Sequence, residues 1–186
     1  MKRSILLLTL TLLFAGTFTA LSQEAESPSP AVETEKVKWM SIQEAYALQA
    51  QSPKKIFIDV YTNWCGWCKR MDASTFSDPT IVRYMNAHYY NVKLDAETSK
   101  EITLAGQKYV NPNPEGRRST HQLAATLLGG QMSYPSYVFL DEKSEKLTVV
   151  KGYMQSDAFE PILHFFATGA YLKESWEAYQ QGWKKE

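Results

Sequence analysis

Apolar and polar positions along the chain predict four strands. One run is apolar on both faces except at Asp59, a pattern typical of a central strand that is covered on both sides. Two other runs flank the polar turn 141–146, which predicts a hairpin. The predicted strands are residues 56–61, 90–94, 136–140 and 147–150.

Helical spacing follows capping signals at several places. Ser41 with Glu44 is a capping-box pattern ahead of a helix that runs to about Gln51. Asp78 before Pro79 marks the start of another helix. A third helix is predicted from Asp157 and Glu160 to Gly169. A C-terminal apolar stripe with helical spacing is interpreted as core packing and consists of Leu172, Trp176, Tyr179 and Trp183.

The order of these elements predicts the fold class. A strand, a helix and a strand are followed by a hairpin and a helix, which implies an α/β protein with a central mixed sheet and helices on both faces. Residues 101–130 fit this order less well, because glycines and prolines punctuate them, and we expect an insertion there. Ser119 or Thr120 would cap a short helix within it that ends at Gly129 and Gly130. A functional role and a surface elaboration are both open for this insertion.

The N-terminal residues are expected to lie outside the folded domain. A basic start and a short apolar stretch precede small residues and Gln23, which predicts a signal peptide over residues 1–22. A retained membrane helix is the alternative. Residues 23–36 carry four Glu and two Pro and are interpreted as a flexible acidic linker. The remainder, 37–186, is long enough for one domain with its own core and would include a C-terminal helix over 171–184. After signal cleavage the protein would be located in the periplasm or secreted.

Composition and charge narrow the class of protein. The 186 residues contain 20 Lys and Arg against 20 Asp and Glu, so the chain offers no electrostatic footprint for nucleic acid. A hydrophobic fraction of 44% is that of an ordinary globular domain and excludes collagen-like, coiled-coil and wholly disordered chains. We expect a monomer.

The candidate chemistry is concentrated in residues 63–69, NWCGWCK, which contain both cysteines of the chain. A strand-to-helix turn places Cys65 at a helix N-terminus, where free N–H groups and the helix dipole favour an anion. Because the thiolate is the nucleophile, Cys65 is expected to attack disulfides near neutral pH. Cys68 lies one turn further on, close enough to attack a mixed disulfide held on Cys65. The pair predicts a redox centre that needs no cofactor.

Other uses of paired cysteines fit this sequence less well. A structural zinc site needs about four ligands, whereas His88, His121 and His164 are dispersed, so no metal is expected. Covalent haem attachment needs a histidine after the second cysteine, where this chain has Lys69. An inert structural disulfide is the alternative that stays open, although closing so short a loop constrains the unfolded chain very little.

These residues resemble the thioredoxin superfamily, and the resemblance covers nearly all of residues 37–169. It implies that Asp59 is the buried carboxylate behind the dithiol and that Lys93 is the lysine that accompanies it. Burial raises the pKa of a carboxyl group, which suits it to accept the proton of the resolving thiol. A partly solvated aspartate at the strand end is the alternative. Tyr134 and Pro135 match the family's cis-proline, which presents backbone groups to an extended substrate.

A closer resemblance is to the C-terminal periplasmic domain of the transmembrane thiol:disulfide interchange reductases, carried by DVYTNWCGWCK and TFSDP at residues 59–69 and 75–79. It implies disulfide-containing polypeptide substrates and a membrane protein as electron donor. The dipeptide Gly66-Trp67 departs from the usual pairs between the cysteines. Because Trp67 adds no positive charge, it favours a reducing or isomerising role over disulfide formation.

An apolar rim around the dithiol is expected to receive donor and substrate. The expected substrate-binding residues are Trp64, Gly66, Trp67, Tyr134 and Pro135, with Tyr61 beside them. Ordinary packing around the turn is the alternative, and it is favoured more for Trp64 than for Trp67. The leading interpretation is an exported thiol:disulfide oxidoreductase that maintains cell redox homeostasis. A dedicated apocytochrome c thiol reductase and a non-catalytic thioredoxin-like binding module are the alternatives.

Overall fold

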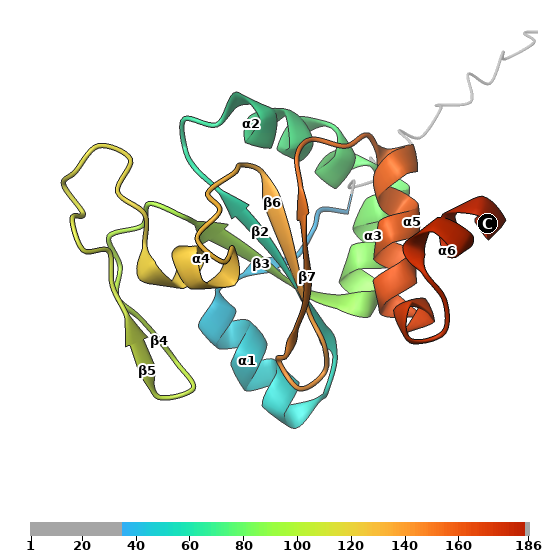
Figure 1. Ribbon diagram of the computed structural model, residues 1–186, viewed down its shortest axis with the longest axis horizontal. Coiled ribbons are helices and arrows are strands. Elements are labelled where there is room, and N and C mark those ends of the chain that lie inside the picture. Colours follow the sequence, from blue (N-terminus) through green and yellow to red (C-terminus); the bar gives the residue numbers. More distant parts are fainter. Residues whose placement is uncertain (1–34, 185–186) are drawn as a thin grey trace, which may run out of the picture. The chain divides into compact units, whose positions relative to one another are not determined.

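The centre of the molecule is a five-stranded mixed sheet with the strand order β1-β3-β2-β6-β7. The structure is a computed structural model that describes residues 35–184. Strands β1, β3 and β2 run parallel, whereas β6 is antiparallel to β2 and β7 is antiparallel to β6 (Figure 1). The strands of this sheet are β1 Trp39–Met40, β2 Lys55–Tyr61, β3 Tyr89–Asp95, β6 Ser136–Leu140 and β7 Lys146–Lys151.

Helices cover both faces of the sheet, as the order of elements predicts (Figure 1). One cluster of buried side chains includes residues from α1 and α4, and a second, mostly aromatic cluster includes residues from α2, α3 and α5. The α-helices are α1 Ile42–Gln51, α2 Gly66–Ala73, α3 Pro79–His88, α4 Gln122–Leu127, α5 Ser156–Ala167 and α6 Trp176–Gly182. The 3-10 turns are η1 Thr75–Ser77 and η2 Ala170–Leu172.

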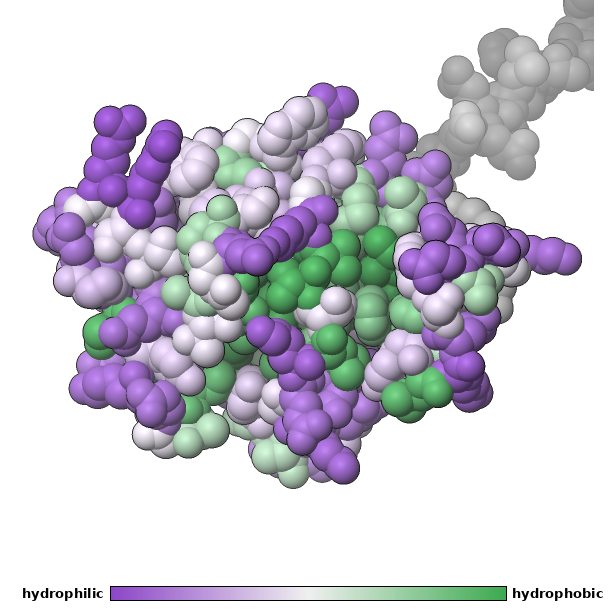
Figure 2. Space-filling view, viewed as in Figure 1, coloured by the Kyte–Doolittle hydropathy of each residue, from purple (hydrophilic) through white to green (hydrophobic). Residues whose placement is uncertain are grey.

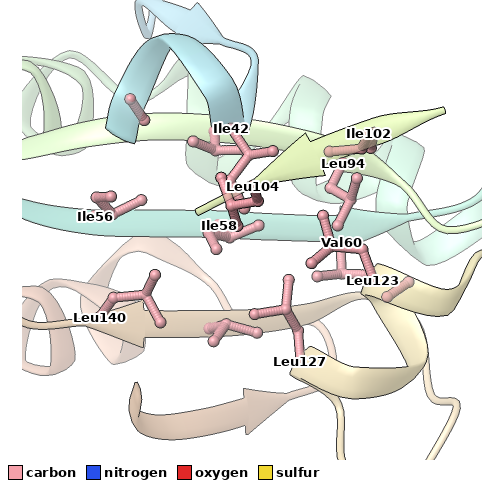
Figure 3. Packing of buried hydrophobic residues seen from close by; sticks show 14 of the residues in the cluster. Ile42, Ile56, Ile58, Val60, Leu94, Ile102, Leu104, Leu123, Leu127 and Leu140 are labelled. Atoms are coloured by element: carbon pink, nitrogen blue, oxygen red, sulfur yellow. The ribbon is translucent and has the colours of Figure 1, made fainter. Parts of the chain in front are cut away.

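Strand β2 separates the two clusters because successive side chains of a strand point to opposite faces. Ile58 and Val60 belong to the cluster that contains Ile42 of α1, and Figure 3 shows these side chains packed together. Phe57 belongs to the aromatic cluster. Asp59, two residues after Phe57, therefore points to the same, aromatic side of the sheet.

The main sequence predictions for this domain are confirmed. All four predicted strands are present, as β2, β3, β6 and β7. Helix α1 has the full capping box, in which Ser41 and Glu44 satisfy each other's backbone N–H groups. Asp78 caps α3 with its side chain, and Pro79 occupies the first turn.

Two predicted helix starts were wrong. Helix α4 is capped by His121, whose side chain accepts a hydrogen bond from Leu123 N–H, and not by Ser119 or Thr120. Helix α5 begins after Gln155, so Asp157 lies inside its first turn, where a carboxylate is favoured by the helix dipole without capping the end. The predicted ends hold, because Gly129, Gly130 and Gly169 all have positive φ.

Part of the predicted C-terminal apolar stripe packs against helix α5. The rings of Trp176 and Tyr179 in α6 lie 5.4 and 5.0 Å from that of Phe165 in α5. The helix predicted over 171–184 begins only at Trp176, and η2 precedes it, so Leu172 does not continue the helical stripe and is 77% exposed. Figure 2 shows that apolar side chains gather in the middle of the face nearest β7, with polar side chains around them.

The insertion contains structure that the sequence pattern did not predict. A second, two-stranded sheet is formed by β4 Ile102–Leu104 and β5 Gln107–Tyr109, and α4 follows it (Figure 1). The expected signal peptide and residues 23–34 of the expected linker lie outside the described residues. Within residues 35–184, no helix is both long enough and apolar enough to cross a membrane.

Candidate active site

Both cysteines lie at the turn that joins β2 to α2. Cys65 is the N-cap of α2, and its Sγ accepts a hydrogen bond from the backbone N–H of Cys68 at 3.0 Å. The two side chains form a disulfide, with their Cα atoms 5.3 Å apart and exposed fractions of only 5% and 3%. When the pair is reduced, the same N–H group and the helix dipole stabilise a thiolate on Cys65.

A buried carboxyl lies behind this turn. Asp59 is 2% exposed, and its neighbours in register are Lys93 on β3 and Tyr137 on β6. Burial raises the pKa of Asp59 to about 7, and the nearby charge of Lys93 only partly opposes this shift. The sequence-based alternative, a solvated aspartate at a strand end, was wrong.

Lys93 joins the buried carboxyl to α2. Its Nζ lies 3.4 Å from Asp59 Oδ2 and also forms an ion pair with Asp72 Oδ1. Asp72 is four residues after Cys68 on α2, so the two side chains share one face of that helix. Cys68 therefore lies on the same face of α2 as the aspartate that binds Lys93.

The loop before β6 completes the site. The Tyr134–Pro135 peptide bond is cis, as the resemblance implied. Ser136 pairs with Val60 near the end of β2, so Pro135 lies beside the strand end that leads to Cys65. The ring of Tyr134 meets that of Trp64 edge to face, with their centroids 6.0 Å apart.

Comparisons with known proteins agree with this geometry. A family model described as a thioredoxin-like domain matches residues 42–167, about two thirds of the chain. This chain belongs to the thioredoxin-like family. The match covers the strand, the dithiol turn and the cis-proline loop described above.

Curated relatives of this thioredoxin-like domain are thiol:disulfide interchange proteins DsbD. The protein of Pectobacterium atrosepticum is 27% identical over 120 residues, which are 63% of this chain and 17% of the relative. That of Haemophilus ducreyi is 25% identical over 140 residues, or 74% of this chain and 21% of the relative. The chain thus spans about a fifth of the length of the curated relatives that it matches.

Solved structures support the same fold. An oxidoreductase named DsbH superposes with a TM-score of 0.53 at 17% identity, over 79% of this chain and 95% of that one. A putative disulphide-isomerase of Bacteroides thetaiotaomicron gives 0.51 at 23% identity, over 76% and 96%. These likenesses show the thioredoxin-like fold alone.

Of the two tryptophans of the thioredoxin-like site, Trp64 differs from the expectation and Trp67 does not. Trp64, for which ordinary packing was favoured, is 51% exposed and donates its indole N–H to Glu97 Oε2 at 2.9 Å. Trp67 is 57% exposed and lies against Tyr153, with the ring centroids 5.4 Å apart. Both indoles therefore border the dithiol as exposed aromatic surface, as a docking rim requires. Gly66 opens α2 between them, and open space surrounds the position that a Cβ would take.

Sequence reasoning missed two residues of this site. The spacing of four residues between Cys68 and Asp72 indicates that both lie on one helix face, but only the fold brings Asp72 to Lys93. Tyr137 carries no signal, since it reads as one more apolar position of a buried strand. Its ring is fully buried, and among the described residues its hydroxyl has no hydrogen-bond partner.

The rings of His88 and His164 both pack against that of Tyr84, at centroid distances of 4.2 and 3.6 Å, whereas His121 is the N-cap of α4. His121 is fully buried and both ring nitrogens are used, Nδ1 by Leu123 N–H and Nε2 with Lys100 O at 3.1 Å. No group of three or more metal-ligating side chains occurs among residues 35–184. His121 is thus a satisfied core histidine that fixes the start of α4.

Proposed function

We propose that this protein is a thiol:disulfide oxidoreductase that reduces or isomerises disulfides in exported polypeptides. The observation that carries the proposal is the hydrogen bond from Cys68 N–H to Cys65 Sγ at the N-terminus of α2, in front of the buried Asp59. A structural disulfide needs neither a stabilised thiolate nor a buried carboxyl behind it, whereas dithiol exchange uses both.

The reaction begins from the reduced pair. The Cys65 thiolate attacks one sulfur of the substrate disulfide, forms a mixed disulfide and releases the other sulfur as a thiolate. Asp59 then accepts the proton of Cys68, directly or through a water, and the new thiolate attacks Cys65 Sγ. The substrate leaves with both its sulfurs reduced, and the protein keeps the disulfide. With a pKa of about 7, Asp59 is partly ionised at neutral pH and can accept that proton.

Partners and location belong to the same proposal. The resemblance to DsbD, an interchange protein by its name, supports polypeptide disulfides as substrates. It also supports a membrane protein as the electron donor that reduces the Cys65–Cys68 disulfide again. A donor of this class is required for reduction, because each cycle that reduces a substrate disulfide consumes two electrons. The apolar start of the chain supports export through a signal peptide over residues 1–22.

A pair of cysteine variants tests the mechanism. With dithiothreitol as the reductant of the Cys65–Cys68 pair, Cys65→Ser should abolish the reduction of insulin disulfides by the protein. Cys68→Ser should still attack and should accumulate the mixed disulfide, because the resolving thiol is gone. Turnover retained by Cys65→Ser, or no mixed disulfide with Cys68→Ser, would overturn the assignment.

The direction of electron flow is tested by the reduction potential. Equilibration of the pair against glutathione should give a value near roughly −270 mV, typical of a reductant. A value near about −120 mV would identify a disulfide-forming oxidase instead.

A further inference from the structure

A pocket beside the dithiol is walled by the insertion. It has a volume of about 340 Å³, and its lining includes Trp64 next to Cys65, Tyr134 next to the cis-proline, and Arg118 from the insertion. The guanidinium of Arg118 lies over the face of the Trp64 indole, 4.8 Å from the ring centroid. The insertion therefore adds a positive charge to the surface that flanks the reacting sulfur.

Arg118 is held in this place by the fold of the insertion. Its φ is +59°, a left-handed conformation that non-glycine residues rarely adopt and that recurs at functional sites. The next residue, Ser119, is fixed by Asn111, which is 7% exposed and donates both to Ser119 O at 2.9 Å and to Glu97 O at 3.2 Å. One buried amide thus ties the Arg118 loop to the turn that carries Glu97.

Arg118 is the cation of the pocket lining. Glu97 also lines the pocket and keeps its negative charge, but its Oε2 accepts the indole N–H of Trp64, and no carboxylate among the described residues forms an ion pair with Arg118. A guanidinium stacked on a ring keeps the N–H groups at its edge free, and that edge matches a carboxylate in two parallel hydrogen bonds.

We infer that this pocket is a subsite for an acidic side chain of the substrate polypeptide, close in sequence to the cysteine under attack. The inference rests on the proposed disulfide exchange at Cys65 and adds a preference among its substrates. Arg118 would bind the substrate carboxylate, and Trp64 would hold the guanidinium in position. Since the insertion supplies the arginine, its role is substrate selection.

The experiment compares two disulfide peptides that differ only in having Glu or Gln on both sides of the cysteine. Dithiothreitol recharges the protein, and kcat/KM is measured for each peptide at low and high salt. The native protein should prefer the Glu peptide about two- to fivefold, the range of exposed charge pairs, and roughly 0.5 M NaCl should remove the preference. Arg118→Gln should reduce the ratio to about one, and Arg118→Lys should restore part of it.

Arg117→Gln is the matched control, because it removes the neighbouring exposed arginine, which no contact places on Trp64. This variant should keep the preference. Equal rates for both peptides with the native protein, or an equal loss with Arg117→Gln and Arg118→Gln, would overturn the subsite while leaving the exchange activity intact. If neither peptide is reduced, the proposed function itself fails.

Discussion

Asp59 and Lys93 lie opposite each other on parallel neighbouring strands, and the ammonium approaches only one oxygen of the carboxyl. Lys93 Nζ is 3.4 Å from Asp59 Oδ2, whereas Oδ1 has no hydrogen-bond partner among the described residues. A carboxylate so sparsely solvated is costly to ionise, which is why its pKa rises to about 7. The site therefore holds a base whose protonation changes near neutral pH.

Asp59→Asn should slow the second chemical step and spare the first. In the native protein, resolution of the mixed disulfide should speed up as the pH rises through about 7, when Asp59 loses its proton. Without the base, resolution should fall roughly 10²-fold near pH 7 and lose that pH step. Single-turnover quenching, which separates mixed disulfide from released product, measures both. An unchanged rate of resolution would remove Asp59 from the mechanism.

The same variant should stabilise the fold at high pH. Because the pKa of Asp59 is higher in the folded state than in the unfolded chain, the folded state binds more protons between about pH 4 and 7, and stability falls as the pH rises. The charged form costs up to about 4 kcal/mol at pH 8, which asparagine avoids. Urea unfolding at pH 5 and pH 8 should show Asp59→Asn gaining more at pH 8. Equal gains at both values would contradict a buried charge.

The resemblance to the thioredoxin superfamily identified this base, and it also identified Lys93 and Pro135, which only folding brings to the site. Sequence reasoning failed for contacts that belong to no motif. Asp59 and the dithiol are six residues apart, so a motif contains them both. Asp72 and Lys93 form an ion pair only because the fold brings α2 close to β3, and no local pattern encodes that contact. The contact of Arg118 with Trp64 is harder still to predict from the sequence, because Arg118 lies in an insertion of irregular backbone. Periodicity carries no information about such segments.

Asp72 shares the ammonium of Lys93 with Asp59, and its negative charge raises the pKa of Asp59. In Asp72→Asn, Lys93 is released to pair with Asp59, so the pKa of Asp59 should fall. The pH step in mixed-disulfide resolution should then move to lower pH. Glu101→Gln is the control, since it removes a carboxylate from an exposed ion pair with Lys108. If the pH step shifted in Glu101→Gln, or did not shift in Asp72→Asn, the coupling of Asp72 to Asp59 would be contradicted.

Two buried tyrosines allow a test of how much a hydrogen bond of a buried hydroxyl contributes to stability. Tyr89 Oη donates to Leu163 O at 2.5 Å, whereas Tyr137 Oη has no partner among residues 35–184. Tyr89→Phe should therefore cost about 1 kcal/mol of unfolding free energy, and Tyr137→Phe should be neutral or stabilising. Chemical denaturation of both variants measures the difference. A loss in Tyr137→Phe as large as in Tyr89→Phe would indicate that the Tyr137 hydroxyl is hydrogen-bonded in solution.

His121 should make the insertion sensitive to acid. Burial lowers the pKa of this histidine, and its neutral ring serves as the N-cap of α4 by accepting from Leu123 N–H. A group whose pKa is lowered on folding contributes stability that is complete above its unfolded value, about 6.5, and is lost as the pH falls through the folded value. Amide exchange in residues 122–128 should therefore reveal more frequent opening at pH 5.5 than at pH 7.5, after correction for intrinsic rates. His121→Asn keeps a capping side chain without a proton to gain, so its opening should be the same at both values. If the native protein opened equally at both, protonation of His121 would have no part in holding α4.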